Sequence, residues 1–128
     1  MKNRAQLITY VDRLAGTLRS LQELLLRGPL RDLFGAVHLL PFFHPIDGAD
    51  AGFDPIDHTA VDPRLGGWKD VRELGTGIDV MADVIVNHIS SRSEQFQDFL
   101  EQAHASPYDG MFLTFDRVFP KGATETDL

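Results

Sequence analysis

Short apolar runs and amphipathic segments alternate along this chain, and their order predicts an α/β fold. The runs at 36–40 and 79–86 are rich in β-branched residues, which is typical of parallel strands covered on both faces. A shorter apolar run at 6–10 predicts one more strand. Alternation of strands and helices in this order indicates parallel strands joined by right-handed crossovers.

Three helices are predicted between and after these strands. The first follows a predicted loop at 11–16, the second precedes the strand at 79–86, and the third follows that strand. Apolar residues at helical spacing define the three faces: Leu18, Leu21 and Leu25; Trp68, Val71 and Leu74; and Phe96, Phe99, Leu100 and Ala103.

The stretch 41–67 has neither a helical nor an alternating period, and we interpret it as one long loop. Prolines and glycines punctuate it throughout. A loop of this length is uncommon in a compact domain and is often functional. Three strands are also few for a stable sheet, because strand edges and helix faces would stay uncovered. We therefore expect an incomplete α/β architecture.

Composition narrows the possible functions. The 128 residues carry a formal net charge of −7, which argues against nucleic acid or an anionic membrane as the main partner. The chain has no cysteine, which excludes disulfides and thiolate metal sites. No window approaches the roughly 18 apolar residues of a membrane span, and the first residues lack a signal-type apolar run. We expect a cytoplasmic protein.

Polar residues stand within and after the strand predicted at 79–86. Ligands of parallel α/β folds bind at the carboxyl ends of strands, so Asn87 and His88 are candidates for chemistry. The alternative is that His88 caps the following segment and Asn87 bonds the loop backbone. Asp83 lies inside the apolar run, where a carboxylate needs donors or a cation. For Asp83 we expect a structural ion pair rather than direct catalysis.

The segment 47–59 combines aspartates, glycines and one proline with an aromatic ring. It is open to three interpretations: a solvated acidic turn, a calcium loop, whose EF-hand spacing is missing, or a sugar site. In a sugar site, carboxylates accept hydroxyl hydrogen bonds and an aromatic ring covers an apolar sugar face. Only the sugar site uses Asp50 and Phe53 together. The histidines have no close metal-ligand spacing, so we expect no zinc.

Two motifs resemble those of the α-amylase superfamily, glycoside hydrolase family 13. Asp-Val-Ile-Val-Asn-His at 83–88 looks like its first conserved motif. Gly-Phe-Asp-Pro at 52–55 is similar to a motif that follows its second barrel strand. Leu-Leu-Pro-Phe-Phe at 39–43 and Asp-Gly-Ala-Asp-Ala at 47–51 further resemble the sucrose phosphorylase family, and the likeness runs through essentially the whole chain.

This resemblance implies the N-terminal three strand–helix units of a (β/α)₈ TIM barrel at 1–106, and the start of a small inserted domain at 107–128. It implies glucosyl transfer from sucrose to inorganic phosphate, which gives α-glucose 1-phosphate and fructose. Retention of configuration needs two carboxyl groups about 5 Å apart. In the family both lie on later strands, so we assign no catalytic residue here. We expect the chain alone to be inactive and poorly folded.

The resemblance also implies substrate contacts. Asp50 binds distal hydroxyls of the glucosyl unit beside an arginine from later in the chain, His88 contacts that sugar near its 6-hydroxyl, and Phe53 forms part of the apolar wall. Asn87 is a metal ligand in calcium-dependent amylases, but the phosphorylases do not use calcium, so we assign no cofactor and no metal.

Two kinds of alternative stay open. Related phosphorylases act on glucosylglycerate, glucosylglycerol or phosphorylated sucrose, and most of their acceptor-side determinants lie beyond Leu128. The chain could instead be a non-catalytic sugar-binding or interaction module that keeps Asp50, Phe53 and His88. The sequence indicates no oligomeric state.

Overall fold

A computed structural model describes residues 4–47, 52–124 and 126 of the chain. The chain divides into two compact units, Met1–Ser93 and Glu94–Leu128. The first unit holds all five strands that the structure describes, so the residues predicted to bind a ligand belong to it.

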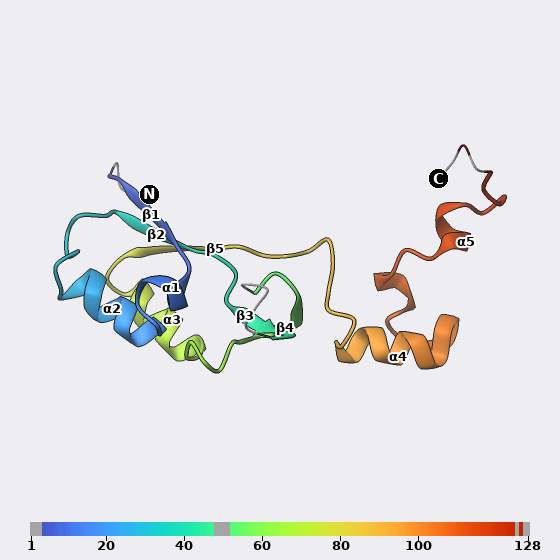
Figure 1. Cartoon of the computed structure of the whole chain (residues 1–128), viewed down its shortest axis with the longest axis horizontal. Coiled ribbons are helices and arrows are strands. Elements are labelled where there is room, and N and C mark those ends of the chain that lie inside the picture. Colours follow the sequence, from blue (N-terminus) through green and yellow to red (C-terminus); the bar gives the residue numbers. More distant parts are fainter. Residues whose placement is uncertain (1–3, 48–51, 125, 127–128) are drawn as a thin grey trace. The chain divides into compact units, whose positions relative to one another are not determined.

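The first unit is built on a parallel three-stranded sheet. Its strand order is β1 (Gln6–Thr9), β2 (Ala36–Leu39) and β5 (Asp79–Ala82). Figure 1 shows the helices of this unit gathered on one side of the sheet: α1 (Val11–Leu14), α2 (Leu18–Leu26) and α3 (Trp68–Gly75). The parallel α/β arrangement predicted from the alternation of apolar patterns is confirmed.

The strand register sorts the side chains into two faces. Leu7, Val37 and Val80 form one row across the three strands and belong to the hydrophobic core. The next row, Ile8, His38 and Met81, points to the opposite side, which we call the open face. Ile8 on this face is 61% exposed. The sheet is therefore covered on one face and accessible on the other.

The first predicted helix forms as α2, and its three leucines are buried. Thr17 caps it, because its side-chain oxygen accepts a hydrogen bond from the Ser20 backbone N–H at 3.1 Å. The predicted face of α3 is also correct, with Leu74 fully buried against the core. The loop predicted at 11–16 is wrong in part, because its first four residues form α1.

The prediction of one long loop at 41–67 is also wrong. Two strands, β3 (Phe43–Pro45) and β4 (Pro55–Val61), pair here in antiparallel fashion. Register shifts on both sides of His44 disturb the pairing. Such irregularities break the alternation that reveals a strand in sequence, which explains why the pattern looked like a loop.

The strand predicted at 79–86 is only half correct, since β5 ends at Ala82. Its neighbour β2 ends at Leu39, whose carbonyl accepts a last hydrogen bond from the Asp83 N–H at 3.3 Å. Pro41 follows in that neighbouring chain segment, and proline has no N–H to continue a ladder. Residues 84–87 therefore leave the sheet although their composition suits a strand.

The second unit consists of short helices. These are α4 (Glu94–Gln102), α5 (Phe115–Val118) and two 3₁₀ turns, η1 (Ala103–Ala105) and η2 (Asp109–Met111). Phe96 and Phe99 of α4 pack against Phe112, with ring centroids 5.2 and 4.9 Å apart. The predicted helix thus exists, and its two phenylalanines make apolar contacts. The predicted apolar face is wrong in its other half, because Leu100 is 60% exposed and Ala103 lies beyond the end of α4 in η1.

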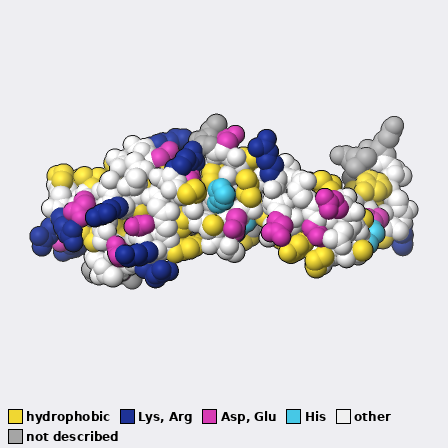
Figure 2. Space-filling model, turned by 90° about the horizontal axis from the view of Figure 1, so that it is seen from below, with side chains coloured by type: hydrophobic (Ala, Val, Ile, Leu, Met, Phe, Trp, Pro, Cys, Tyr) yellow, Lys and Arg dark blue, Asp and Glu magenta, His cyan; other side chains and the backbone are white. Residues whose placement is uncertain are grey.

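Among the described residues, no helix is long and apolar enough to cross a membrane. On the face of the molecule drawn in Figure 2, basic and acidic side chains are interspersed over the part of the first unit that carries the helices. That mixture differs from the continuous basic surface that nucleic acid requires.

Candidate functional site

The carboxyl ends of β1, β2 and β5 meet at one edge of the sheet, and the sequence-predicted residues follow them. Tyr10 succeeds β1, and the β3–β4 pair succeeds β2. Residues 83–88 succeed β5. Backbone carbonyls, loops and side chains from three strands thus converge where parallel sheets bind their ligands.

Phe53 and His88 come together at this edge. The Nε2 atom of His88 lies 2.6 Å from the carbonyl oxygen of Phe53. Because a carbonyl only accepts hydrogen bonds, the imidazole N–H is the donor. The bond ties the segment after β5 to the loop before β4, so the Nε2 atom of His88 makes a long-range contact rather than a cap of the segment that follows.

Gly52 shapes the backbone that presents Phe53. Its φ of +82° lies in the left-handed region, which favours glycine. A Cβ added at this position would come within 2.7 Å of the Pro41 carbonyl oxygen. The loop therefore passes close to the end of β2 only because residue 52 has no side chain. The Phe53 side chain remains 46% exposed and is available to a ligand.

Asp50, the third residue predicted to bind substrate, lies outside the described residues. Asn87 is exposed at the end of the segment that follows β5. Of the three predicted substrate contacts, the structure therefore brings together two, Phe53 and His88.

Asp83 finds the side-chain partner that the sequence predicts, and the two form an ion pair when His38 is protonated. Its Oδ1 atom lies 2.7 Å from Nε2 of His38, on the open face of the sheet. The side chains are 35% and 19% exposed, respectively. The partner is a histidine on the neighbouring strand, which no sequence spacing could have identified.

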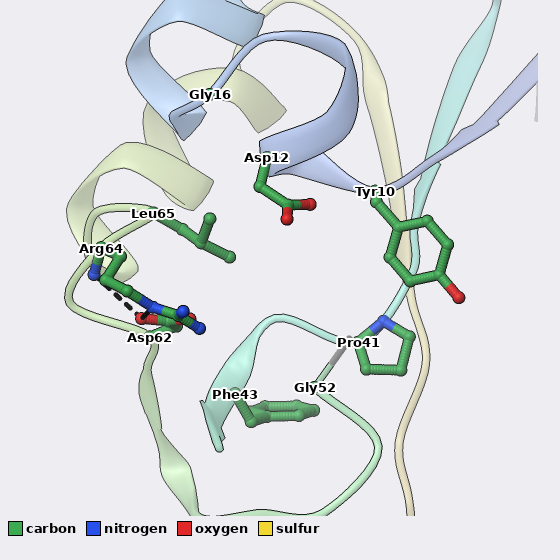
Figure 3. Close-up of a pocket in the computed structure, with 9 residues that line it drawn as sticks. All are labelled: Tyr10, Asp12, Gly16, Pro41, Phe43, Gly52, Asp62, Arg64 and Leu65. Carbon is green, nitrogen blue, oxygen red and sulfur yellow. Dashed lines mark hydrogen bonds and ion pairs between the residues drawn. The ribbon is translucent and has the colours of Figure 1, made fainter. Parts of the chain in front are cut away.

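A hollow of about 120 Å³ opens at the same edge of the sheet, beside Gly52. Figure 3 shows Asp12 and Leu65 pointing toward its centre and Arg64 paired with Asp62 on one wall. Neither Phe53 nor His88 lines it. Sequence reasoning missed this group, although the Asp-Pro-Arg order at 62–64 is a turn signal that would have placed Asp62 and Arg64 together.

Asp62 is buried and fully engaged by Arg64. It accepts hydrogen bonds from the Arg64 backbone N–H at 2.9 Å and from Nε at 3.0 Å. Burial favours the neutral acid, but the hydrogen bonds and charge of Arg64 outweigh burial and hold the pKa of Asp62 below its ordinary value. The same pairing raises the pKa of Arg64. Asp62 is thus an ionised, structural carboxylate rather than a proton donor.

No described group of three or more histidine, aspartate or glutamate side chains could hold a metal ion. The edge of the parallel sheet offers hydrogen-bonding groups and the accessible ring of Phe53. Such a combination suits a polar ligand with hydroxyl groups and apolar faces.

Comparison with known proteins places this geometry in a family. The α-amylase catalytic domain matches residues 30–124. The chain is 59% identical over 128 residues to a sucrose phosphorylase of Agrobacterium vitis, and 57% identical over 129 residues to a sucrose phosphorylase of Bifidobacterium adolescentis. Both matches cover all of this chain, and 26% and 25% of those proteins.

A solved structure agrees with these matches. The sucrose 6F-phosphate phosphorylase from Thermoanaerobacter thermosaccharolyticum superposes with a TM-score of 0.82 at 42% identity, over 91% of this chain and 23% of that one. The chain therefore spans about a quarter of the length of the relatives that it matches. Its three parallel strand–helix units correspond to part of a larger α/β fold.

Proposed function

This chain belongs to the α-amylase family, and from that membership we propose that it forms the N-terminal quarter of a sucrose phosphorylase. The complete enzyme would transfer the glucosyl group of sucrose to inorganic phosphate with retention of configuration, giving α-glucose 1-phosphate and fructose. The high identity to two sucrose phosphorylases over the whole chain supports this substrate over phosphorylated sucrose, where the identity is lower.

The hydrogen bond between His88 and Phe53 carries the proposal. It brings two residues predicted to contact the glucosyl unit to the carboxyl edge of the sheet, although they are 35 positions apart in sequence. His88 would form a hydrogen bond near the 6-hydroxyl, and the exposed Phe53 ring would cover an apolar sugar face. Asp50 would hold distal hydroxyls beside an arginine from later in the enzyme.

Catalysis requires residues beyond this chain. A retaining mechanism needs a carboxylate nucleophile and a carboxylic acid about 5 Å apart, and we assign neither role to residues 1–128. The proposal includes no metal and no cofactor. It keeps 1–106 as the first part of the barrel and 107–128 as the start of the small inserted domain.

A cytoplasmic location is part of the proposal. The product is a charged sugar phosphate, and a charged molecule does not cross an apolar bilayer by itself. Phosphorolysis inside the cell would therefore retain the glucosyl group there in a phosphorylated form.

A chimaera tests the function directly. Residues 1–128 replace the matching 129 residues of the Bifidobacterium adolescentis enzyme, with which they share 57% identity. We expect this chimaera to release glucose 1-phosphate from sucrose and phosphate at a rate within about tenfold of the parent. The substitution His88→Ala should lower kcat/KM by about tenfold or more, since one hydrogen bond to a substrate hydroxyl is lost.

The control variant is Arg27→Ala, which removes only an exposed ion pair with Glu23 on α2. It should leave the kinetics unchanged. A chimaera that unfolds cooperatively but catalyses no phosphorolysis would overturn the proposal.

The alternative, a self-sufficient sugar-binding module, has a separate test. The 128-residue chain alone is titrated with sucrose in a calorimeter. A saturable binding isotherm would favour the module, whereas the phosphorylase proposal expects no measurable binding, because Asp50 would lack its partner.

A further inference from the structure

The ion pair between His38 and Asp83 lies at the last point where β5 is held by the sheet. The Asp83 backbone N–H donates to the Leu39 carbonyl at 3.3 Å, and its side chain reaches His38 at 2.7 Å. Both bonds join Asp83 to β2, one through its backbone N–H and the other through its side chain. Asp83 is therefore a double attachment point at the end of the β5 ladder.

The chain beyond Asp83 leads to His88 outside the sheet. Residues 84–87 belong to no strand or helix; Val84 and Val86 are strongly exposed, whereas Ile85 between them is buried. Further along, the segment is held by the His88 bond to Phe53 and by the bond from the Ser90 N–H to the Pro55 carbonyl at 2.9 Å. The place of His88 thus depends on how firmly the segment is fixed at each end.

We propose that His38 is a positioning residue for the proposed reaction, because it fixes Asp83 and thereby the segment that presents His88 to the glucosyl unit. This inference rests on the proposed function, in which His88 contacts substrate. His38 itself touches neither Phe53 nor His88 by any hydrogen bond that the structure describes. Its effect would pass through Asp83 and the backbone of residues 83–88.

The stability supplied by the pair is small, whereas its effect on geometry is large. Partly exposed ion pairs contribute little to the free energy of folding. A displacement of about 1 Å at a substrate-contacting group, by contrast, can reduce catalytic efficiency about a hundredfold. Loss of His38 should therefore appear in substrate binding more strongly than in the melting temperature.

The test uses the chimaera and compares His38→Ala with His38→Gln. The alanine variant removes the donor to Asp83 and should raise the KM for sucrose about tenfold. The glutamine variant retains an N–H donor of similar reach and should restore KM to within about threefold of the unsubstituted chimaera.

Val37→Ala is the matched control. Val37 is the preceding residue of β2, but it is fully buried on the helix-covered face and makes no contact with Asp83 that the structure describes. Its truncation should lower the melting temperature and leave KM unchanged. A purely structural role of His38 would give this same pattern, namely lower stability or a smaller active fraction with KM intact, and would overturn the inference.

Hydrogen exchange supplies a measurement that does not depend on activity. In His38→Ala, backbone amides of residues 83–90 should exchange faster than in the unsubstituted chimaera, while those of α2 stay as they were. Unchanged exchange in 83–90 would overturn the inference even if the chimaera were inactive. An inactive but folded unsubstituted chimaera with the expected exchange pattern would instead overturn the proposed function alone.

Discussion

The indole nitrogen of Trp68 donates a hydrogen bond to the carbonyl oxygen of Thr59 across 2.6 Å. Trp68 is the first residue of α3, and Thr59 lies within β4. The indole also meets the Phe42 ring edge-on, with centroids 5.8 Å apart. The Trp68 side chain thereby links α3, which packs on the parallel sheet, to the antiparallel β3–β4 pair next to Phe53.

Replacing Trp68 with phenylalanine should lower the free energy of unfolding of the chimaera by about 1 kcal/mol. The aromatic contact is largely kept, but the Thr59 carbonyl loses its donor. Denaturant unfolding measures the change. Lys69→Ala, which removes only an exposed contact with Glu73, is the neighbouring control and should have little effect. An unchanged midpoint for Trp68→Phe would mean that water replaces the indole without loss.

Gly52→Ala should destabilise the chimaera by more than about 2 kcal/mol. The left-handed backbone costs alanine about 1 kcal/mol, and the new Cβ would also collide with the Pro41 carbonyl oxygen. Gly16 provides a matched comparison, since its φ of +81° is nearly the same but a Cβ added there would meet nothing within 4 Å. Gly16→Ala should therefore cost only about 1 kcal/mol in thermal unfolding. Equal costs at the two sites would show that the collision relaxes freely.

Arg64→Ala should destabilise the fold by about 1 kcal/mol near neutral pH, since Asp62 keeps its charge and the backbone N–H of residue 64 but loses the guanidinium. The pKa of Asp62 is lowered in the folded chain from 3.8. The pair therefore contributes fully above that value, and its contribution disappears as the pH falls through the lower folded pKa.

Urea midpoints of the two proteins at intervals from pH 6 down to pH 3 measure this effect. The difference in urea midpoint between the unsubstituted protein and Arg64→Ala should be constant near pH 6 and should shrink below about pH 3.8. A difference that grows with acidity would contradict the assignment of Asp62 as the titrating group.

The 128-residue chain by itself should associate in solution. The open face exposes Ile8 and Met81, and Val84 and Val86 beyond β5 are also exposed. Exposed apolar side chains of this kind promote association. Light scattering of the purified chain should report large species at micromolar concentration, and the chimaera measured alongside should not. A monomer with a sharp, reversible unfolding transition would contradict this expectation.

The sequence correctly predicted the elements in which a repeated pattern of apolar side chains marks the buried face. Leu18, Leu21 and Leu25 mark α2 correctly, because a long helix repeats its apolar face several times. α1 has four residues and repeats nothing. The end of β5 depends on Pro41 in another segment, so the valines that follow Ala82 suggested a strand that has no partner.

The candidate site likewise contains features that the sequence predicted and features that it did not. Motif resemblance indicated Phe53 and His88, and the structure brings them into contact. The bond runs from the His88 side chain to the Phe53 backbone carbonyl. Every residue has such a carbonyl, so the sequence could not indicate which one accepts the bond. The pairing of His38 with Asp83 could not be predicted either, because a strand pattern does not specify which residue of the neighbouring strand lies beside Asp83. Asp50 remains known from its motif alone.

The direction of the bond between His88 and Phe53 also sets what the imidazole can recognise. When the ring is neutral and its only proton is on Nε2, Nδ1 carries a lone pair and can only accept. A hydroxyl can satisfy that lone pair by donating its hydrogen, but a ring or glycosidic oxygen cannot. If His88 contacts the glucosyl unit as proposed, a neutral ring whose Nε2 proton is held by Phe53 would select free hydroxyl groups over ether oxygens.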